Sequence, residues 1–312
     1  MILVGALFQV VIFALGGLLL QGYLARLRSR AEGRRGAPMT QPLRETLKWW
    51  GKESVRSAES SAWTRVAPVI LLTLALLGAA LVPLVELPGS SALSLDLVGG
   101  TLVWMSGSLI LVLLALDPGT AFGGMGASRA VTLAALAEPA LLVAVVGLSV
   151  GAGSSSSSAI LLGEIHHTAQ VVSPAHLLLG VALLVVLLTE TGRMPVDNPA
   201  THLELTMIHE ALVLELAGQD YALVSLAESL RFGWILGLVA TLLVPFGVAS
   251  GGGVVALILS AGVLVVKMTV LATLVGIIEI SSAKLRLFRV PELLAGGVVS
   301  AVLGTIATVV AR

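Results

Sequence analysis

Long runs of apolar residues alternate along the chain with short polar segments. A run of about 20 apolar residues is long enough for a helix to cross the hydrocarbon core of a bilayer. We predict a membrane-spanning helix for each run of about that length. The predicted spans cover residues of about 2–24, 67–87, 97–116, 130–150, 174–190, 229–249, 254–278 and 293–311. The pattern therefore predicts an all-α, polytopic integral membrane protein of about eight helices, with one membrane domain over residues 1–312.

The positions of the basic residues support this count and give an orientation, because cytoplasmic loops carry an excess of Lys and Arg. If the first helix runs from outside to inside, the inner segments hold 16 of the 18 Lys and Arg residues, ten of them between Arg26 and Arg65. Only Lys267, within a span, and Arg312, at the end, remain. We therefore expect both termini outside. The inner loops, which form the candidate docking surface, cover about 25–66, 117–129, 190–228 and 279–292.

Two of the loops have distinctive compositions. In PMTQPLRETLKWWGKE, residues 38–53, the apolar side chains Leu43, Leu47 and Trp50 recur at helical spacing opposite basic residues. This pattern predicts a short amphipathic helix that lies in the membrane interface. The outer loop 151–168 contains a serine run, whose composition is typical of a flexible connector with no reason to pack.

Composition agrees with a membrane protein and limits the chemistry of the chain. Hydrophobic residues make up 57% of the sequence and charged residues 12%, and the mean hydropathy is +1.02. Without cysteine, the chain can hold no four-cysteine iron–sulfur cluster and no Cys-ligated zinc. His202 and His209 lie about 10 Å apart along a helix, too far to share a haem iron. We expect no cofactor, no metal and no catalytic residue in this chain.

Two ionisable residues fall within predicted spans, where a charge costs a few kcal/mol or more. Glu138 is followed by Pro139, which removes a backbone donor, and Lys267 lies near the middle of the seventh span. One interpretation is that each is paired across helices, with the other or elsewhere, and holds the bundle together. The other is that both belong to a proton path.

The stretch TETGRMPVDNPATHLELTMIHEALVLE, residues 189–215, is strongly hydrophobic yet rich in ionisable groups. Pro195 and Pro199 interrupt it, which predicts a folded-in inner segment followed by a helix over about 201–217. Because intramembrane irregular segments line cavities or are buried in protein, this segment is a candidate functional element.

Acidic residues are concentrated in this stretch. Glu204 and Glu215 are eleven residues apart, about three helical turns, so both would project from one face, whereas Glu210 would point away. Together with Glu190 they form a candidate chain of protonatable sites. The alternative is a solvated face of a cytoplasmic helix, which the interspersed leucines disfavour.

The residues that carry a family resemblance lie in the same region. The segment 190–223 closely resembles the signature segment of the membrane subunit of group 4 nickel-iron hydrogenases and formate hydrogenlyase. That family is related to the quinone-site membrane subunit of respiratory complex I. The segments 117–142 and 38–53 resemble further parts of the same family, so the resemblance covers most of the chain. The acidic cluster is thinner than in the quinone-reducing branch, which favours the hydrogenase branch.

The resemblance implies a subunit that is not itself catalytic, in a prokaryotic plasma membrane. Its implied partners are hydrogenase-like large and small subunits, ferredoxin-like iron–sulfur subunits and antiporter-like membrane subunits, which would hold the nickel-iron site and the clusters. The lipid bilayer is a further partner, and no nucleic acid is expected. The alternatives are a quinone-site subunit of a complex I NADH dehydrogenase, a stand-alone ion transporter and a passive anchor.

A mechanism follows as a hypothesis. The inner loops would dock the peripheral arm, and Arg193 and Asp197 would fix the broken segment by a charge pair. Redox changes in the arm would shift protons among the acids of the stretch toward Glu138 and Lys267. The segment from Pro195 to Pro199 is the candidate two-state element. Arg129, in the second inner loop, is a further candidate docking residue.

Overall fold

Eight long helices dominate the computed structural model, which describes residues 2–86, 96–166, 171–197, 208–249, 253–285 and 289–311. They are α1 (Ile2–Ala31), α3 (Ala62–Leu81), α4 (Leu97–Leu116), α5 (Ala121–Ala152), α8 (Pro174–Glu190), α10 (Gly218–Leu243), α11 (Val254–Ser281) and α12 (Val290–Val310). Seven are long and apolar enough to cross a membrane, and α8, with 17 residues, is a shorter apolar helix. The prediction of a polytopic helical membrane protein with about eight helices is confirmed.

Two long helices begin well before their predicted starts. Helix α5 begins at Ala121 rather than near residue 130, and α10 begins at Gly218 rather than near residue 229. Arg129, expected in a loop, therefore lies within α5, and Arg231 lies buried within α10. The hydropathy pattern missed the first turns of α10 because they contain Asp220 and Glu228, which the structure pairs with Arg56 and Arg231. It missed the first turns of α5 because they contain three glycines and Arg129.

Helix α10 is the centre of the bundle and packs against α1, α2, α3, α8 and α11. In its most apolar stretch 78% of the residues are buried, compared with 22% in α12, which covers α5 and α8. Small residues let α1 approach it closely: a Cβ at Gly17 would overlap the Ser229 carbonyl, and one at Gly233 would overlap the Phe13 carbonyl. Close backbone approach at small residues is a common way to join helices inside membranes.

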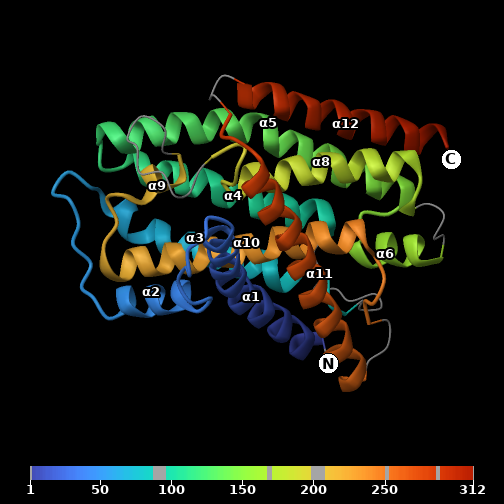
Figure 1. Cartoon of the computed structure of the whole chain (residues 1–312), viewed down its shortest axis with the longest axis horizontal. Coiled ribbons are helices and arrows are strands. Elements are labelled where there is room, and N and C mark those ends of the chain that lie inside the picture. The colour runs from blue at the N-terminus through green and yellow to red at the C-terminus, as the bar shows by residue number, and fades with distance from the viewer. Residues whose placement is uncertain are drawn as a thin grey trace.

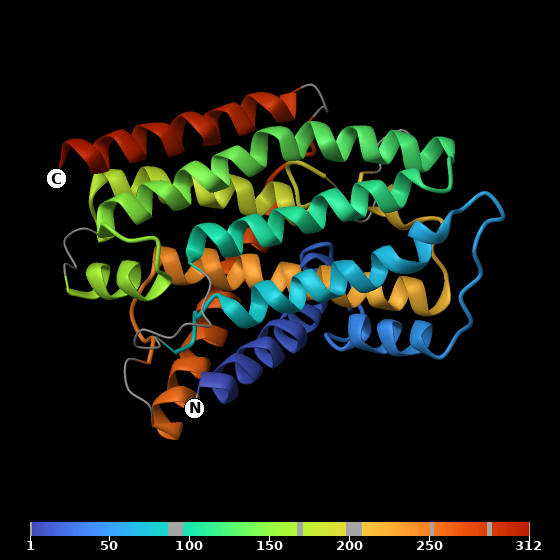
Figure 2. The ribbon, with the colours of Figure 1, turned by 180° about the vertical axis from the view of Figure 1, so that it is seen from behind.

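The long helices do not all share one direction. In Figures 1 and 2, α1 and α11 run obliquely across the other long helices. Two short helices, α2 (Gln41–Trp50) and α9 (His209–Val213), lie at one end of the bundle, and α6 (Ser157–His166) lies at the other, near the C-terminal end of α12 (Figure 1). We call these the α9 end and the α6 end.

The short helices confirm one prediction and correct another. Helix α2 confirms the predicted amphipathic helix, and its side chains Leu47 and Trp50 remain 64% and 52% exposed. The outer serine run is not merely a flexible connector, because Ser157 begins α6 and is itself buried. The Ser157 hydroxyl donates to the carbonyl of Pro83, 74 positions earlier, at 3.3 Å. This hydrogen bond gives the buried hydroxyl a partner.

The predicted helix over 201–217 is not formed as expected. Among the described residues of this range, only α9 is helical, and a turn follows it before α10 begins at Gly218. Gly218 has a φ of +55°, and a Cβ there would overlap the Glu53 carbonyl, so this turn requires glycine. Residues 198–207, which include Pro199 and Glu204, lie outside the described residues.

A fully hydrogen-bonded amide fixes α1 to the end of α3. The side chain of Gln9 is 2% exposed; its Nε2 donates to the carbonyls of Ala79 at 2.6 Å and Val82 at 2.7 Å. Its Oε1 accepts from the backbone N–H groups of Leu84 at 2.8 Å and Val85 at 3.1 Å. One side chain therefore satisfies four backbone groups where α3 ends in an apolar environment.

Gln9→Leu is expected to lower the free energy of unfolding by several kcal/mol, since each buried polar group left without a partner costs about 1–3 kcal/mol. Thermal unfolding of the purified protein in detergent measures the loss. Val11→Leu, on an exposed position of the same helix, is the control and should behave like the wild type. Equal stability of Gln9→Leu and Val11→Leu would contradict the role given to the amide.

Candidate functional site

Two adjoining cavities lie at the α9 end, among α4, α5, α8, α9 and α10. Their volumes are about 240 and 120 Å³. Both are lined by Glu190, Ile208, His209, Glu228 and Arg231. We call the two together the Glu190 cavity. Ionisable groups from four helices meet here, with Arg231 buried and Glu138, Glu190, His209 and Glu228 half-buried, which is unusual inside an apolar bundle.

Arg231 is the most heavily bonded side chain of the cavity. Its guanidinium pairs with Glu228 at 2.8 Å, one turn earlier on α10, and donates to the Ser108 hydroxyl at 2.6 Å and the Trp104 carbonyl at 3.3 Å. It also lies over the Trp104 ring, 4.8 Å from its centroid. Gly107 leaves room for this arrangement, because a Cβ there would come within 2.9 Å of Arg231 Nε. Helices α4 and α10 thus hold one positive charge at a fixed position.

Glu190 is the last residue of α8, and four charged groups act on its carboxyl: Arg231, Glu138, His209 and Glu228. Glu138, half-buried on α5, lines the larger cavity and is under the influence of Ser108 and Arg231. Three carboxyl groups therefore share one guanidinium and one imidazole. Because the carboxyl groups outnumber the positive groups beside them, they can exchange protons as one coupled group rather than as independent sites.

The segment that follows α8 is fixed to the end of α11 at three points. Arg193 pairs with Glu279 at 3.4 Å, Asp197 pairs with Lys284 at 2.8 Å, and the Pro195 carbonyl accepts from the Leu285 N–H at 2.9 Å. The expected charge pair between Arg193 and Asp197 is therefore wrong, because α11 and the residues after it supply a separate partner to each.

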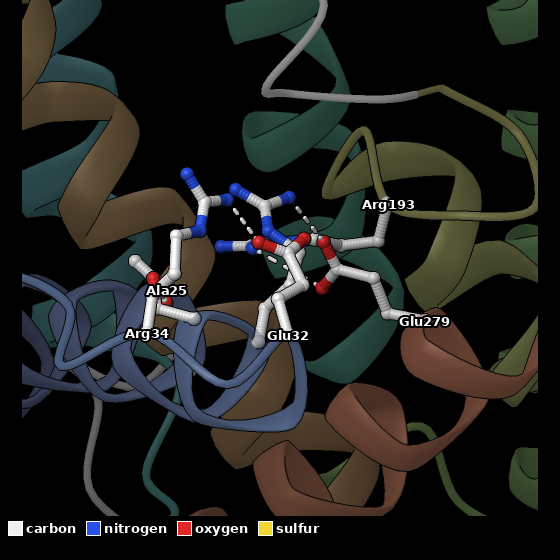
Figure 3. A network of polar contacts seen from close by, with 7 residues as sticks. Ala25, Glu32, Arg34, Arg193 and Glu279 are labelled. Atoms are coloured by element: carbon white, nitrogen blue, oxygen red, sulfur yellow. Dashed lines mark hydrogen bonds and ion pairs between the residues drawn. The ribbon is translucent and has the colours of Figure 1, made fainter.

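Glu279 is shared between two arginines. Its side chain is 1% exposed, and it binds Arg28, near the end of α1, at 2.8 Å in addition to Arg193. Figure 3 shows Arg193 and Glu279 facing each other, with the exposed ion pair of Glu32 and Arg34 nearby. The buried carboxylate thus joins three parts of the chain that are far apart in sequence.

Asp197 and His209 form the boundary of the smaller cavity. His209 Nδ1 lies 3.7 Å from Asp197 Oδ2, which is a charge contact rather than a hydrogen bond. Burial opposes ionisation of both groups, but His209 and Lys284 hold the pKa of the Asp197 carboxyl below its ordinary value, and Asp197 raises the pKa of His209. Gly192 makes room for this imidazole: its φ is +57°, and a Cβ would lie 2.6 Å from His209 Nδ1.

The structure brings several of the predicted site residues together and separates others. Those that line the Glu190 cavity are Glu138, Glu190, Arg193, Asp197 and Glu210. Glu215 is exposed in the turn after α9, so it does not continue a buried line of carboxylates. Lys267 and Glu138 do not pair; the Lys267 ammonium donates to the carbonyl of Val244, the residue that ends α10.

Sequence reasoning overlooked three central residues: Glu228, Arg231 and Glu279. The first two are three residues apart on one helix, a spacing at which opposite charges pair, and this signal was present in the sequence. Glu279 follows an apolar run, and the sequence places it at the start of the last inner loop, 279–292. Its importance depends on Arg28 and Arg193, which no local pattern connects to it.

No group of three or more His, Asp or Glu residues within the described parts of the chain could hold a metal ion, and the chain has no cysteine. Fold and site define a multi-pass helical membrane protein with a partly buried network of ionisable groups at one end.

The chain belongs to the NADH dehydrogenase family, whose model matches residues 3–310. Among curated relatives, formate hydrogenlyase subunit 4 of Escherichia coli (strain K12) is 27% identical over 288 residues, 91% of each chain. Hydrogenase-4 component C of the same organism is 29% identical over 285 residues, covering 89% of this chain and 87% of that protein. The resemblance read from the sequence is confirmed.

A solved structure shares the fold. It belongs to the membrane-bound sulfane sulfur reductase, described as an archaeal respiratory membrane complex. The TM-score is 0.79 and the identity 19%, and the match covers 98% of this chain and 99% of that one. The arrangement of helices is therefore that of a known membrane subunit over almost its whole length.

His209→Gln is expected to destabilise the protein most at low pH. Because its pKa is raised in the folded state, protonated His209 contributes stability that is complete below its ordinary value of about 6.5 and is lost as pH rises through the raised value. Asp197 sets the lower limit of the pH range in which the pair is charged. The stability that ionised Asp197 contributes is complete above its ordinary pKa of about 3.8 and is lost as pH falls through its lowered pKa.

The measurement is the difference in unfolding temperature between wild type and His209→Gln from about pH 5.5 to 9, a range that spans the ordinary histidine value. The difference should shrink as pH rises. In an Asp197→Asn background it should depend little on pH. A difference that is constant with pH in the wild-type background would exclude Asp197 as the source of the effect.

Proposed function

We propose that the chain is a non-catalytic membrane subunit of a multisubunit, complex I-like hydrogenase or formate hydrogenlyase. It anchors a peripheral arm that holds the nickel-iron site and the iron–sulfur clusters, and it couples electron transfer in that arm to the translocation of protons or sodium ions. The observation that carries the proposal is the partly buried network of ionisable groups that lines the cavity around Glu190, in a chain without cysteine. The family and the names of the two bacterial relatives support it.

The docking surface in this proposal is the α9 end. The loop between α1 and α3 carries α2 and ten Lys and Arg residues between Arg26 and Arg65. This loop is held in place by an ion pair between Arg56 and Asp220 at 2.7 Å and by the edge-to-face contact of Trp49 with Tyr221. By the positive-inside rule, we assign this end to the cytoplasmic side of a prokaryotic plasma membrane.

A series of charge contacts, joined between Arg193 and Asp197 only by a backbone hydrogen bond of 3.2 Å, leads from the docking surface to the cavity. Arg28, at the start of the basic loop, binds Glu279, and Glu279 binds Arg193. The segment from Arg193 to Asp197 then contacts His209, whose charge acts on Glu190. A change of charge in the docked arm would alter the field along this series. The segment containing Pro195 remains our candidate for the two-state element that such coupling requires.

The charge balance of the cavity suits a cation. In its larger part, Glu138, Glu190 and Glu228 supply three carboxyl groups, against the fixed positive charge of Arg231 and the titratable His209. The smaller part adds Asp197 and Glu210 against Arg193, so acids outnumber bases throughout. Such excess of acid over base inside a membrane is typical of proton and cation paths. Lys267 lies apart from the cavity, and its place on the path remains a prediction.

A quinone-site subunit is the second candidate, favoured by the name of the family model. The two adjoining parts of the Glu190 cavity, about 240 and 120 Å³, together lie at the lower end of the range of about 300–1,000 Å³ typical of pockets for small organic ligands. Their acidic lining, rather than their volume, favours the passage of protons or small cations. Strong inhibition of the purified complex by quinone-site inhibitors would instead favour the quinone subunit.

The first test is the composition of the native complex. The chain is tagged, extracted gently from its own membrane and analysed with its partners by mass spectrometry. We expect a nickel-iron large subunit and cysteine-rich ferredoxin-like chains. Recovery with NADH-oxidising subunits would establish the quinone alternative, and recovery of the chain alone would indicate a stand-alone transporter.

Glu190→Gln is expected to slow ion translocation roughly tenfold or more, equivalent to about 1.4 kcal/mol in the barrier, without preventing assembly. The change keeps the shape of the side chain and removes its proton-exchanging group. Acidification of vesicles containing the purified complex measures the rate. Glu292→Gln, exposed in the first turn of α12, is the matched control.

Glu215→Gln separates two interpretations of the acids. If the Glu190 cavity defines the path, Glu215→Gln should resemble the control, because Glu215 is exposed. A loss equal to that of Glu190→Gln would restore the line of carboxylates expected from the sequence. Normal translocation in Glu190→Gln would remove Glu190 from the mechanism.

A further inference from the structure

A second buried pair of ionisable groups lies at the α6 end. His176, in the first turn of α8, places its Nδ1 3.3 Å from Oε1 of Glu164 on α6. The two residues are 8% and 7% exposed. Helix α6 buries Ser157, Ile160 and Leu161 together with Glu164, so the acid lies on the face that packs against the bundle. This pair has no place in the function proposed above.

Each member of the pair has one polar atom without a hydrogen-bond partner. Among the described residues, neither Glu164 Oε2 nor His176 Nε2 is bonded, although both atoms are buried. Both residues line a cavity of about 650 Å³ between α5, α6, α8 and α12. Buried polar atoms of this kind require a partner, and a cavity of this size holds many water molecules, each of which occupies about 30 Å³ in the liquid.

The chemistry of the two free atoms limits what they can bind. If His176 shares its Nδ1 proton with Glu164, then Nε2 and Oε2 are both acceptors, so the ligand must bring protons. The parts of α5 and α12 that line the cavity contribute no titratable group, and His166, on α6, is exposed. Two side chains are too few for a typical metal site. Water, which both donates and carries protons, meets these requirements.

We propose that Glu164 and His176 form a proton-exchange site that reaches water through this cavity, on the membrane side opposite Glu190. The proposal rests on the ion-translocating function argued above and assigns its outer station. A proton from cavity water binds at Nε2 or Oε2, the pair shares it through Nδ1 and Oε1, and it returns to water; no other bond changes. His176 and Glu190 lie at opposite ends of α8, 14 residues and about 21 Å apart.

Access of water is tested by labelling. Because the chain has no cysteine, Gly163→Cys places a single thiol in this chain beside Glu164. A Cβ at Gly163 meets nothing within 4 Å, so the substitution fits. In the intact complex in sealed vesicles, a membrane-impermeant maleimide added on the side of the α6 end should modify it. Ala182→Cys, buried on α8, is the control that should stay unmodified. An unmodified Gly163→Cys would overturn the proposal.

Proton binding is tested separately. Infrared difference spectra of the intact complex, recorded between low and high pH, should contain a carboxyl band that Glu164→Gln removes. Thr308→Val is the matched control, because Thr308 lines the same cavity and its hydroxyl only bonds the Gly304 carbonyl within α12. The band should persist in this variant. Identical spectra for wild type and Glu164→Gln would overturn the proposal, whether or not the complex translocates protons.

Translocation distinguishes this proposal from the general function. In vesicles, Glu164→Gln and His176→Gln should reduce proton translocation to less than about one tenth of the wild-type rate, the scale of losing a positioned proton-transfer group, while Thr308→Val stays normal. Wild-type complex that translocates no ion would defeat the proposed function. Wild type that translocates protons, with both variants assembled and equally fast, would defeat only the role of this pair.

Discussion

A carboxylate buried among apolar helices must have a positive partner, and Glu279 has two. Removing one partner from a buried ion pair typically costs about 3–5 kcal/mol, because the other charge remains without compensation. Arg28 and Arg193 come from the end of α1 and from the segment after α8, so one carboxylate fixes both relative to α11. The position of that segment in turn places Gly192 against His209 and closes the smaller cavity. The whole α9 end therefore depends on this shared charge.

The same constraint explains how the most buried of the long helices can carry three charged residues. Asp220, Glu228 and Arg231 all belong to α10, and each pairs within the protein. A helix surrounded by other helices can carry charge because its neighbours supply partners, whereas α12, which is largely exposed, carries only Glu292 in its first turn. Hydrogen bonds from Gln9 serve the same purpose for the backbone where α3 ends.

Much of the fold could be predicted from the sequence, because each membrane helix is a local property of an apolar run. The amphipathic helix α2 was predicted for the same reason. The start of α10 was not predicted, because a hydropathy window cannot distinguish the paired Asp220 and Glu228 from acids of a loop. The start of α5 was not predicted because its glycines and Arg129 resemble a loop. The cavity was predicted in part: Glu138 was recognised as a costly charge and Glu190 as a candidate protonatable site, but their meeting with Glu228 depends on packing between helices. The pair of Glu164 and His176 depends on α6, which the serine run concealed.

The length of α8 has a consequence for the electrical behaviour of the protein. Its 17 residues extend about 26 Å, less than the hydrocarbon thickness of about 30 Å. A helix of this length cannot reach both surfaces of the hydrocarbon layer, and water that reaches both of its ends would make the insulating layer locally thin. A membrane potential of 100 mV is equivalent to about 2.3 kcal/mol per elementary charge, and here it would then fall over a shorter distance than elsewhere in the bilayer. The voltage across the membrane would thus change the free energy of protonation of the groups at the two ends of α8.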